Sequence, residues 1–391
     1  MEYHFLPVKK VHYGEHVVED KLLHEILAKH ANRILIVTTN SLIESQSYRK
    51  LSNLLNQCST LVVTSRQHVP GDRLMNETTD IRAFKPNLIL SFGGGSAIDF
   101  AKIVSLILAE NIETEEELFQ YSVNSHRKKA DMHGSIPHFA IPTTLSAAEY
   151  TCIAGVTNNQ DQAKYGFHHL SLTPEQVFLD PVYTTETPQW LWLSTGMRAV
   201  DHAVETLYSP KKNPVNVTLA LKALEYLYHW LPLSKEEPDS LTHRLNCQLG
   251  AWMSLFSNIN IKLGLSHSIG HQLGSLYHIP HGMTSAIMLP HVMEYLLKET
   301  HQEQAQIYDA LVSERRDVST EEKAEKAIEL IRDLIVQLEI PHRLRDFHVS
   351  KDSLSKVVKG ILMDIKGEDN PLVFKLNLTE NHLLALLEKA W

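Results

Sequence analysis

One segment of the chain, from Lys85 to Glu110, constrains the fold more than any other. It reads KPNLILSFGGGSAIDFAKIVSLILAE, a short apolar run that ends in glycines and passes directly into a longer run with helical spacing. A short apolar run bounded by turn residues is typical of a buried strand, and the longer run predicts a helix. Parallel strands need a crossover connection, which is usually a helix. The segment therefore predicts a parallel sheet that is covered by helices on both faces.

The same alternation of short apolar runs and amphipathic runs extends over the first half of the chain. Helices are predicted at 19–31 and 43–55, and strands at 33–39, 59–65, 139–142 and 177–181. Beyond Pro181 helical periodicity dominates, and β-branched runs nearly vanish. The pattern predicts an α/β domain at residues 1–183 and an all-α domain at residues 184–391, joined near Asp180 to Pro188.

Composition excludes several classes of partner. With 391 residues the chain is long enough for two or three domains, and its net charge of −9 argues against nucleic acid or an anionic membrane as a partner. Cys58, Cys152 and Cys247 are far apart and form no CxxC pattern, which favours buried thiols in a reducing compartment. The N-terminus lacks an apolar signal region, and no apolar run of about 18 residues follows, so a cytoplasmic protein is expected.

Two glycine- and threonine-containing turns suggest a ligand that carries phosphate. The turn Gly93-Gly94-Gly95-Ser96 separates a predicted strand from a helix, where backbone N–H groups can approach a pyrophosphate. It matches neither GxGxxG nor GxxxxGK[ST], so an ordinary Rossmann or P-loop assignment does not apply. Thr143 and Thr144 follow the next strand and offer hydroxyl groups to the same ligand. The alternative is that both segments are plain turns.

The segment from Lys262 to Gly282 contains the densest cluster of histidines. His267 and His271 are four residues apart, which places both imidazoles on one face of a helix, and His281 follows a proline in a turn-like stretch. Imidazole is the commonest neutral metal ligand and a frequent general acid or base, so the cluster suggests a metal site, a proton relay or both. Because the chain has 23 histidines, chance clustering is the alternative.

Upstream, the segment from Thr195 to Glu205 places four polar side chains on one side of a predicted helix. Met197, Val200, Val204 and Leu207 form its apolar face, whereas the opposite side carries Arg198, Asp201, His202 and Glu205. A solvated helix face with weak ion pairs is the alternative to a functional site.

Together these motifs resemble those of the iron-containing alcohol dehydrogenases, which share a fold with dehydroquinate synthase. The matching segments follow the family's order: FLPVKKVHYG, QHVP, GGGSAIDFAK, IPTT, FLDP, TGMRAVDHAVE, HxxxHxxxxxxxxxPHG and LPHVMEY. The resemblance implies that the α/β domain binds NADH or NADPH on its glycine turn and that the helical domain is catalytic. It also implies hydride transfer between the nicotinamide and a carbonyl or alcohol carbon of a small molecule. A homodimer, with FLPVKKVHY as an edge strand, is expected as well.

The resemblance also assigns roles to the histidines. His202, His267 and His281 match three metal ligands of the family, but Arg198 stands where the fourth ligand, an aspartate, is expected. A guanidinium cannot lose its proton in a protein and repels a divalent cation, so the usual metal site is broken. The maleylacetate reductases, a branch of the family, keep the three histidines, lack the aspartate and are thought to work without metal. The QHVP segment is also similar to theirs, so the chain resembles this branch more closely.

The function that follows is a metal-independent carbonyl reductase. Arg198, with His202 and His267 as hydrogen-bond donors, would replace the metal in stabilising the alkoxide, and His271 matches the residue that relays a proton. Arg198 could instead bind a substrate carboxylate, which would select an oxo acid. A metal-dependent alcohol dehydrogenase with a rearranged site is one alternative. A nucleotide-binding relative with a lyase or regulatory role is another.

The cofactor-binding positions are also assigned by the resemblance. Thr39 replaces the acidic residue that rejects the additional phosphate of NADP, so NADPH is expected to be tolerated or preferred. Other positions match residues of the family that contact the cofactor: Gly94, Gly95, Ser96, Asp99, Thr143, Thr144 and Lys164. Ala147 and Ala154 replace polar residues, and Leu372 replaces the arginine of an Asn-Pro-Arg signature.

Overall fold

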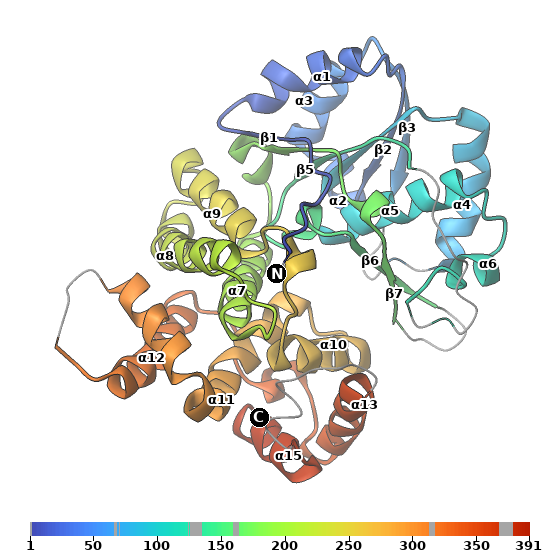
Figure 1. The fold of residues 1–391 in the computed structure, drawn as a ribbon. Helices are drawn as coiled ribbons and strands as arrows, with labels where there is room; N and C mark the ends of the chain where they lie inside the picture. The colour runs from blue at the N-terminus through green and yellow to red at the C-terminus, as the bar shows by residue number, and fades with distance from the viewer. Residues whose placement is uncertain are drawn as a thin grey trace. The chain divides into compact units, whose positions relative to one another are not determined.

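The chain folds into two compact units, Met1–Thr187 and Pro188–Trp391, as seen in a computed structural model (Figure 1). The structure describes residues 2–65, 69, 71–123, 125, 135–158, 164–312, 317–366 and 378–391, with backbone alone at 72, 73, 164 and 363–366. Most of the QHVP segment and Leu372 lie outside these residues. The domain boundary between residues 183 and 184 stays a prediction.

The first unit contains a six-stranded sheet in which all the paired strands run parallel, as predicted. The strand order is β1-β8-β5-β4-β2-β3, so β1, within the expected edge segment, forms one edge. The strands are β1 Lys10–Tyr13, β2 Arg33–Thr38, β3 Ser59–Thr64, β4 Leu88–Gly93, β5 His138–Pro142 and β8 Gln176–Leu179. A separate antiparallel pair, β6 Ile153–Thr157 and β7 Lys164–His168, has no counterpart among the predicted strands.

Alternating side chains of the central strands divide the core of this unit into two clusters. Leu35 and Val37 of β2 belong to one cluster, and Ile34 and Ile36 belong to the other. Successive side chains of a strand point to opposite faces, so each face of the sheet has its own apolar core. The predicted coverage on both faces is therefore confirmed.

Helices of the first unit cover these two faces. The first core cluster includes α5, and the second includes η1, α1 and α3. The elements are η1 Val18–Leu22, α1 Leu23–Ala28, α2 Asn40–Ile43, α3 Gln46–Leu54, α4 Gly71–Phe84, α5 Gly95–Ala109, α6 Glu115–Phe119, η2 Ala148–Tyr150, η3 Leu170–Leu172 and η4 Pro181–Thr184.

The prediction of one continuous helix at 43–55 is wrong in its first turn, because α3 begins only at Gln46. Ser45 has an extended backbone and its side chain accepts a hydrogen bond from the Tyr48 amide, so it caps α3. This N-cap separates α3 from the short α2, because an N-cap residue does not take helical dihedral angles. The helix predicted at 19–31 is likewise divided into a π-helical turn and α1.

The order of the strands creates a topological switch point. β2 lies between β3 and β4, so the chain leaves β2 toward one side and later returns to pair with its other side. In open parallel sheets, ligands bind outside the carboxyl ends of the strands at such a point. Thr39 follows β2 and the glycine turn follows β4, so both flank this position.

The second unit is helical throughout its described residues, as predicted. Its elements are α7 Gln189–Tyr208, α8 Pro214–Glu236, α9 Leu241–Ser254, η5 Asn258–Asn260, α10 Leu265–Tyr277, α11 His281–Leu311, α12 Thr320–Gln337, η6 Leu344–Phe347, η7 Lys351–Ser353, α13 Leu354–Lys366 and α15 Glu380–Lys389. Helix α7 contacts α8, α9, α10 and α11. It is consequently buried over most of its length.

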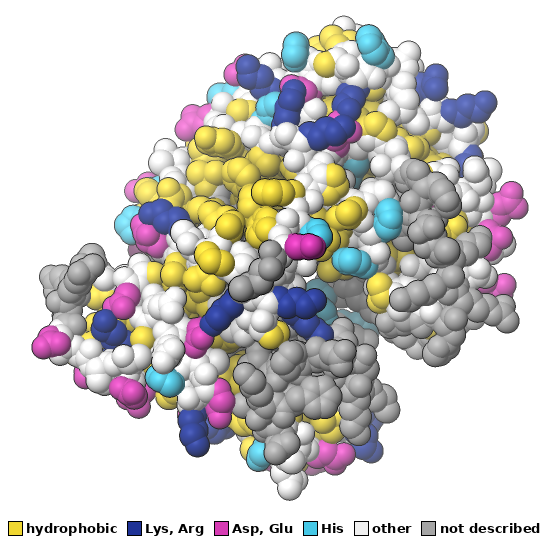
Figure 2. All heavy atoms as spheres, viewed as in Figure 1, with side chains coloured by type: hydrophobic (Ala, Val, Ile, Leu, Met, Phe, Trp, Pro, Cys, Tyr) yellow, Lys and Arg dark blue, Asp and Glu magenta, His cyan; other side chains and the backbone are white. Residues whose placement is uncertain are grey.

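The prediction of buried thiols is confirmed for two of the three cysteines. Cys152 and Cys247 are buried, Cys58 is partly exposed, and all three are free. Figure 2 shows basic and acidic side chains interspersed on the visible face. No helix among the described residues is both long enough and apolar enough to cross a membrane.

Candidate active site

Helix α7 carries the four polar side chains that the sequence placed on one side of it. The exposed fractions of Arg198, Asp201, His202 and Glu205 are 9%, 0%, 4% and 1%. The alternative of a solvated helix face is therefore wrong, because α10 and α11 pack over this side of α7. Buried charges need compensating partners, and the contacts of these side chains supply them.

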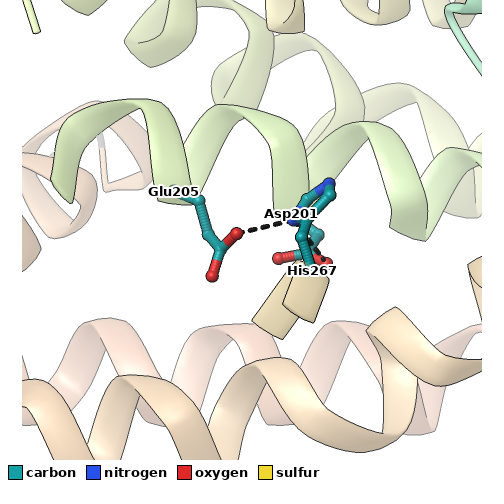
Figure 3. Close-up of side chains that lie close together, drawn as sticks. All are labelled: Asp201, Glu205 and His267. Atoms are coloured by element: carbon teal, nitrogen blue, oxygen red, sulfur yellow. Dashed lines mark hydrogen bonds and ion pairs between the residues drawn. The ribbon is translucent and has the colours of Figure 1, made fainter. Parts of the chain in front are cut away.

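Glu205 holds His267 in a fixed orientation. Its carboxylate accepts hydrogen bonds from the backbone N–H groups of Gly264 and Ser266 at 2.7 and 2.6 Å, at the start of α10. The Nδ1 atom of His267 lies 2.6 Å from Oε2 of Glu205 (Figure 3). Because a carboxylate that already accepts two bonds acts as an acceptor here too, Nδ1 carries the proton and Nε2 does not.

Asp201 and Arg198 are joined through a serine. The Ser285 hydroxyl, on α11, donates to Oδ2 of Asp201 at 2.6 Å and accepts from an Arg198 guanidinium N–H at 3.2 Å. The same guanidinium nitrogen lies 3.7 Å from Oδ2 of Asp201. The Ser266 hydroxyl donates to that oxygen at 3.0 Å. Asp201 therefore serves as the counter-ion of Arg198.

Burial shifts the protonation equilibria of all these groups. Burial, reinforced by Glu205, raises the pKa of the Asp201 carboxyl, whereas the charge of Arg198 and the hydrogen bonds from Ser285 and Ser266 act in the opposite direction and favour its ionised form. Burial also raises the pKa of Glu205. Burial lowers the pKa of His202 and of His267 far below the ordinary imidazole range, and the positive charge of Arg198 acts in the same direction. Both imidazoles are consequently neutral at physiological pH.

Three buried polar atoms in this cluster lack a hydrogen-bond partner among the described residues. They are Oδ1 of Asp201, Nδ1 of His202 and Nε2 of His267. The rings of His202 and His267 stack with centroids 5.0 Å apart. Unpartnered buried polar groups are costly, so their grouping indicates a place for a ligand. Nε2 of His267 can accept a hydrogen bond, which differs from the donor role expected from the sequence.

The remaining two predicted histidines lie together. The rings of His271, on α10, and His281, at the start of α11, meet edge to face with centroids 5.5 Å apart, and His271 is exposed. Position 282 has no room for a side chain, since a Cβ there would lie 2.2 Å from the Ser194 carbonyl oxygen of α7. Close approach of α11 to α7 thus requires glycine directly after His281.

The donor set does not fit the family's metal site. Among the described residues, the group whose ligand atoms all lie within 4.8 Å of one another is Asp201, Glu205 and His267, not the three predicted histidines. Glu205 is already engaged by N–H donors, and the Arg198 guanidinium lies next to Asp201. A fixed positive charge at this distance opposes the binding of a divalent cation.

In the first unit, the two predicted turns contact each other after the neighbouring strands β4 and β5, next to the switch point. A Cβ on Gly94 would lie 2.9 Å from Cγ2 of Thr144, and one on Gly95 would lie 3.3 Å from Oγ of Ser146. Gly93 has a φ of +155°, which favours glycine. The first N–H groups of α5 have no partner within the helix and favour an anion. The turn therefore fits a pyrophosphate.

The other predicted cofactor residues occupy varied positions. Thr39 is the N-cap residue of α2, and its hydroxyl lies 3.1 Å from that of Ser41. The Asp99 carboxylate accepts from the Gly155 amide, and the Thr143 carbonyl accepts from the Thr187 hydroxyl. Ser96 is the second residue of α5. Lys164 begins β7, and its side chain lies outside the described part of the structure.

Several site residues were missed from the sequence. Ser266 and Ser285 lie next to predicted residues, but nothing in the local pattern marks a serine as a partner of Asp201. The sequence places Glu205 on the polar side of α7 but assigns it no role. Lys102 had a signal, because it interrupts an apolar helix: its ammonium donates to the carbonyls of Ala148, Thr151 and Ile153 at 2.7 to 2.8 Å.

Comparisons with known proteins agree with this architecture. Residues 8–181 match the model for "Iron-containing alcohol dehydrogenase", and residues 192–391 match that for "Fe-containing alcohol dehydrogenase family, C-terminal". The dehydrogenase FUM7 of Gibberella moniliformis is 37% identical over 194 residues, which span 47% of this chain and 46% of that protein. The match thus covers about half the length of this relative.

Two further similarities extend over most of the chain. An alcohol dehydrogenase of Thermococcus barophilus is 28% identical over 354 residues, covering 89% of this chain and 88% of that protein. The solved structure of an alcohol dehydrogenase from Oenococcus oeni shares the fold with a TM-score of 0.91 at 22% identity, over the full length of both chains. Maleylacetate reductases are also among the similar proteins. The chain belongs to the iron-containing alcohol dehydrogenase family.

Proposed function

We propose that the protein is an NAD(P)-dependent oxidoreductase that reduces a carbonyl group to an alcohol, or catalyses the reverse reaction, without a metal ion. The observation that carries the proposal is the buried Arg198 guanidinium, which Ser285 and Asp201 hold beside the neutral imidazole of His267. One nitrogen of this guanidinium contacts Ser285 and Asp201, and its other N–H groups have no acceptor among the described residues. They are available to a substrate oxygen.

The residues of the second unit would then act on the reacting oxygen. Reduced nicotinamide supplies the hydride when it is bound. Arg198 donates N–H bonds to the carbonyl oxygen and stabilises the negative charge that develops on it. Nε2 of His267, which Glu205 fixes as an acceptor, would accept a hydrogen bond from the hydroxyl group of the alcohol. The ring of His202 stacks on the ring of His267. His271 is exposed and would pass the proton between solvent and the site.

The nucleotide would bind in the first unit, at the switch point. The amides at the start of α5, with Gly94 and Gly95, would hold the pyrophosphate, and Thr144 and Ser96 would add hydroxyl donors. Thr39, at the carboxyl end of β2, would face the adenosine ribose. Because Thr39 brings no negative charge, we expect NADPH to be accepted along with NADH.

The grouping of Asp201, Glu205 and His267 favours one competing function, a metal-dependent dehydrogenase with a rearranged site. Elemental analysis of the purified protein and turnover with and without a chelator distinguish the two. We expect less than stoichiometric zinc or iron and turnover that the chelator leaves unchanged. Stoichiometric metal whose removal abolishes turnover would contradict the proposed mechanism.

One assay tests the activity itself. NADH and NADPH oxidation is followed with a panel of aldehydes, ketones and oxo acids, using the wild-type chain and Arg198→Met. The variant preserves much of the side-chain volume but removes every donor. We expect kcat to fall by about 100-fold or more in this variant, in line with the loss of a donor that stabilises an oxyanion. Equal kcat values in the two proteins would reject the role of Arg198.

We also propose that two copies pair through β1. This strand lies at an edge of the sheet and bonds to β8 on its other side, so its outer backbone groups are available to a second copy. Sedimentation velocity should give the mass of a dimer. The Lys9 N–H donates to the Glu175 carbonyl on the β8 side, and successive residues of a strand direct their N–H groups to opposite sides, so the N–H of Lys10 faces outward. A Lys10→Pro substitution should then shift the distribution toward monomer, whereas a monomeric wild-type chain would refute this assembly.

A further inference from the structure

A carboxyl group inside the protein is placed to balance the charge of Arg198 before any substrate binds. Its guanidinium lies 3.7 Å from Oδ2 of Asp201, which is fully buried. Ser285 bridges the two side chains, accepting from Arg198 and donating to Asp201. The pair is therefore a buried salt bridge with a hydrogen-bonded link, and neither partner is compensated by solvent.

A second carboxyl group lies in the same cluster. Glu205 interacts electrostatically with both Arg198 and Asp201. Arg198 contributes one positive charge, and one ionised carboxylate is enough to cancel it. Ionisation of both carboxyl groups would make the cluster negative. The imidazoles of His202 and His267 are neutral, so they supply no additional positive charge.

These charges bear on the substrate that Arg198 can accept. An α-oxo acid carries a carboxylate directly beside its carbonyl group, and binding it here would add a negative charge to a buried cluster that has no surplus positive charge. A neutral carbonyl oxygen needs only hydrogen-bond donors, which the guanidinium still offers. Burying a charge without a partner is far more costly than burying a polar group that is hydrogen-bonded.

We propose that Asp201 determines specificity: by neutralising Arg198, it selects substrates whose reacting carbonyl has no adjacent carboxylate, namely uncharged aldehydes and ketones. This inference rests on the proposed function, because it takes Arg198 as the group that contacts the reacting oxygen. The sequence left open whether Arg198 stabilises the alkoxide or binds a substrate carboxylate, and this inference favours the first role. A carboxylate more distant on the substrate would be bound by other residues.

The test compares α-oxo acids with their amides, such as pyruvate with pyruvamide. The members of a pair have nearly the same shape and differ in charge. Their ketone groups also differ in intrinsic reactivity, so the change in the ratio of their kcat/KM values between the wild type and a variant isolates the effect of the protein on the carboxylate. For the wild-type chain we expect the amide to be favoured by about tenfold or more. A wild-type preference for the acid would overturn the proposal without any variant.

Variants then identify the residue responsible. Asp201→Asn keeps the size and the hydrogen bonds of the side chain but releases the charge of Arg198, so the selectivity should shift toward the acid by about tenfold. In the Arg198→Met background the same Asp201→Asn change should leave the selectivity unaltered, because the two residues act as a unit. A damaged fold would lower kcat/KM for both substrates without altering their ratio.

The outcomes also separate this inference from the proposed function. If Arg198→Met keeps full activity on amides and acids alike, the role of Arg198 in the reaction fails and this inference fails with it. If Arg198→Met is inactive while Asp201→Asn retains both the activity on the amide and the selectivity of the wild type, the proposed function stands and the role of Asp201 is wrong.

Discussion

Nδ1 of His267 lies 2.6 Å from Oε2 of Glu205, although the two residues are 62 positions apart in the chain. Helix α7 supplies the carboxylate and the first turn of α10 supplies the imidazole, so packing of these helices fixes which ring nitrogen carries the proton. A carboxylate behind an imidazole orients the ring and raises its basicity, and loss of such a partner of a metal-binding histidine typically costs about 10- to 100-fold in activity.

Glu205→Gln should therefore lower kcat by about 10- to 100-fold. The amide can donate to Nδ1, which allows the proton to move to Nε2 and removes the acceptor that faces the substrate. The ¹⁵N chemical shifts of the His267 ring report the tautomer directly. A variant with wild-type kcat and an unchanged tautomer would show that Glu205 is only a structural partner of the start of α10.

The glycine turn gives a prediction about nucleotide binding. Gly94→Ala places a methyl group 2.9 Å from Cγ2 of Thr144, so either the threonine or the turn must move. We expect the dissociation constant for NADPH to rise about tenfold, measured by fluorescence titration, which corresponds to roughly 1.4 kcal/mol. Gly166→Ala is the matched control, because its Cβ would lie 3.4 Å from Val123, an ordinary contact. Equal affinities in both variants would remove Gly94 from the site.

Much of the fold follows from the sequence because it depends on local periodicity. The strand, glycine turn and helix from Lys85 to Glu110 are as predicted, since burial on both faces of a parallel sheet leaves a continuous apolar run. The polar side of α7 was harder to interpret. Arg198 and Glu205 read as surface residues because their partners, Ser285 and His267, come from distant helices, and only tertiary packing reveals that all four are buried.

Burial of a lysine predicts a stability effect in the first unit. The Lys102 ammonium is fully enclosed and bonded to three backbone carbonyls and the Thr151 hydroxyl. Lys102→Met removes the ammonium donor. The Thr151 carbonyl then loses this bond, and the carbonyls of Ala148 and Ile153 keep bonds from Thr151, so we expect unfolding free energy to fall by about 1–3 kcal/mol. Urea denaturation measures the change. Lys222→Met, in an exposed pair with Glu225, is the control and should cost less than about 1 kcal/mol.

His138 predicts how stability depends on pH. Burial, with a smaller contribution from Lys102, lowers its pKa to about 3, whereas the unfolded chain has the ordinary value near 6.5. Between these values the unfolded state binds a proton that the folded state does not. The contribution of His138 to stability is therefore complete above pH 6.5 and declines as the pH falls, by up to about 1.4 kcal/mol per unit.

The variant His138→Gln isolates this contribution. Glutamine can keep a hydrogen bond to the Ser91 hydroxyl, which lies 2.8 Å from Nε2 of His138, but it does not titrate. Urea unfolding at pH 4.5, 5.5 and 7.5 should show a weaker loss of stability at acid pH in the variant than in the wild type. Parallel curves for the two proteins would mean that His138 is accessible to protons in the folded state.

The choice of cofactor can be tested at the end of β2. An aspartate at position 39 would accept hydrogen bonds from the ribose hydroxyls of NADH and repel the phosphate of NADPH. We expect Thr39→Asp to lower the ratio of kcat/KM for NADPH to that for NADH by about tenfold or more, because a repulsive group adds to the loss of a neutral contact. Thr39→Ser, which retains a hydroxyl at the N-cap position of α2, should leave the ratio within about twofold of the wild type, as no charge changes. A ratio that is insensitive to the aspartate would place the ribose away from Thr39, and the switch point between β2 and β4 would then hold the pyrophosphate alone.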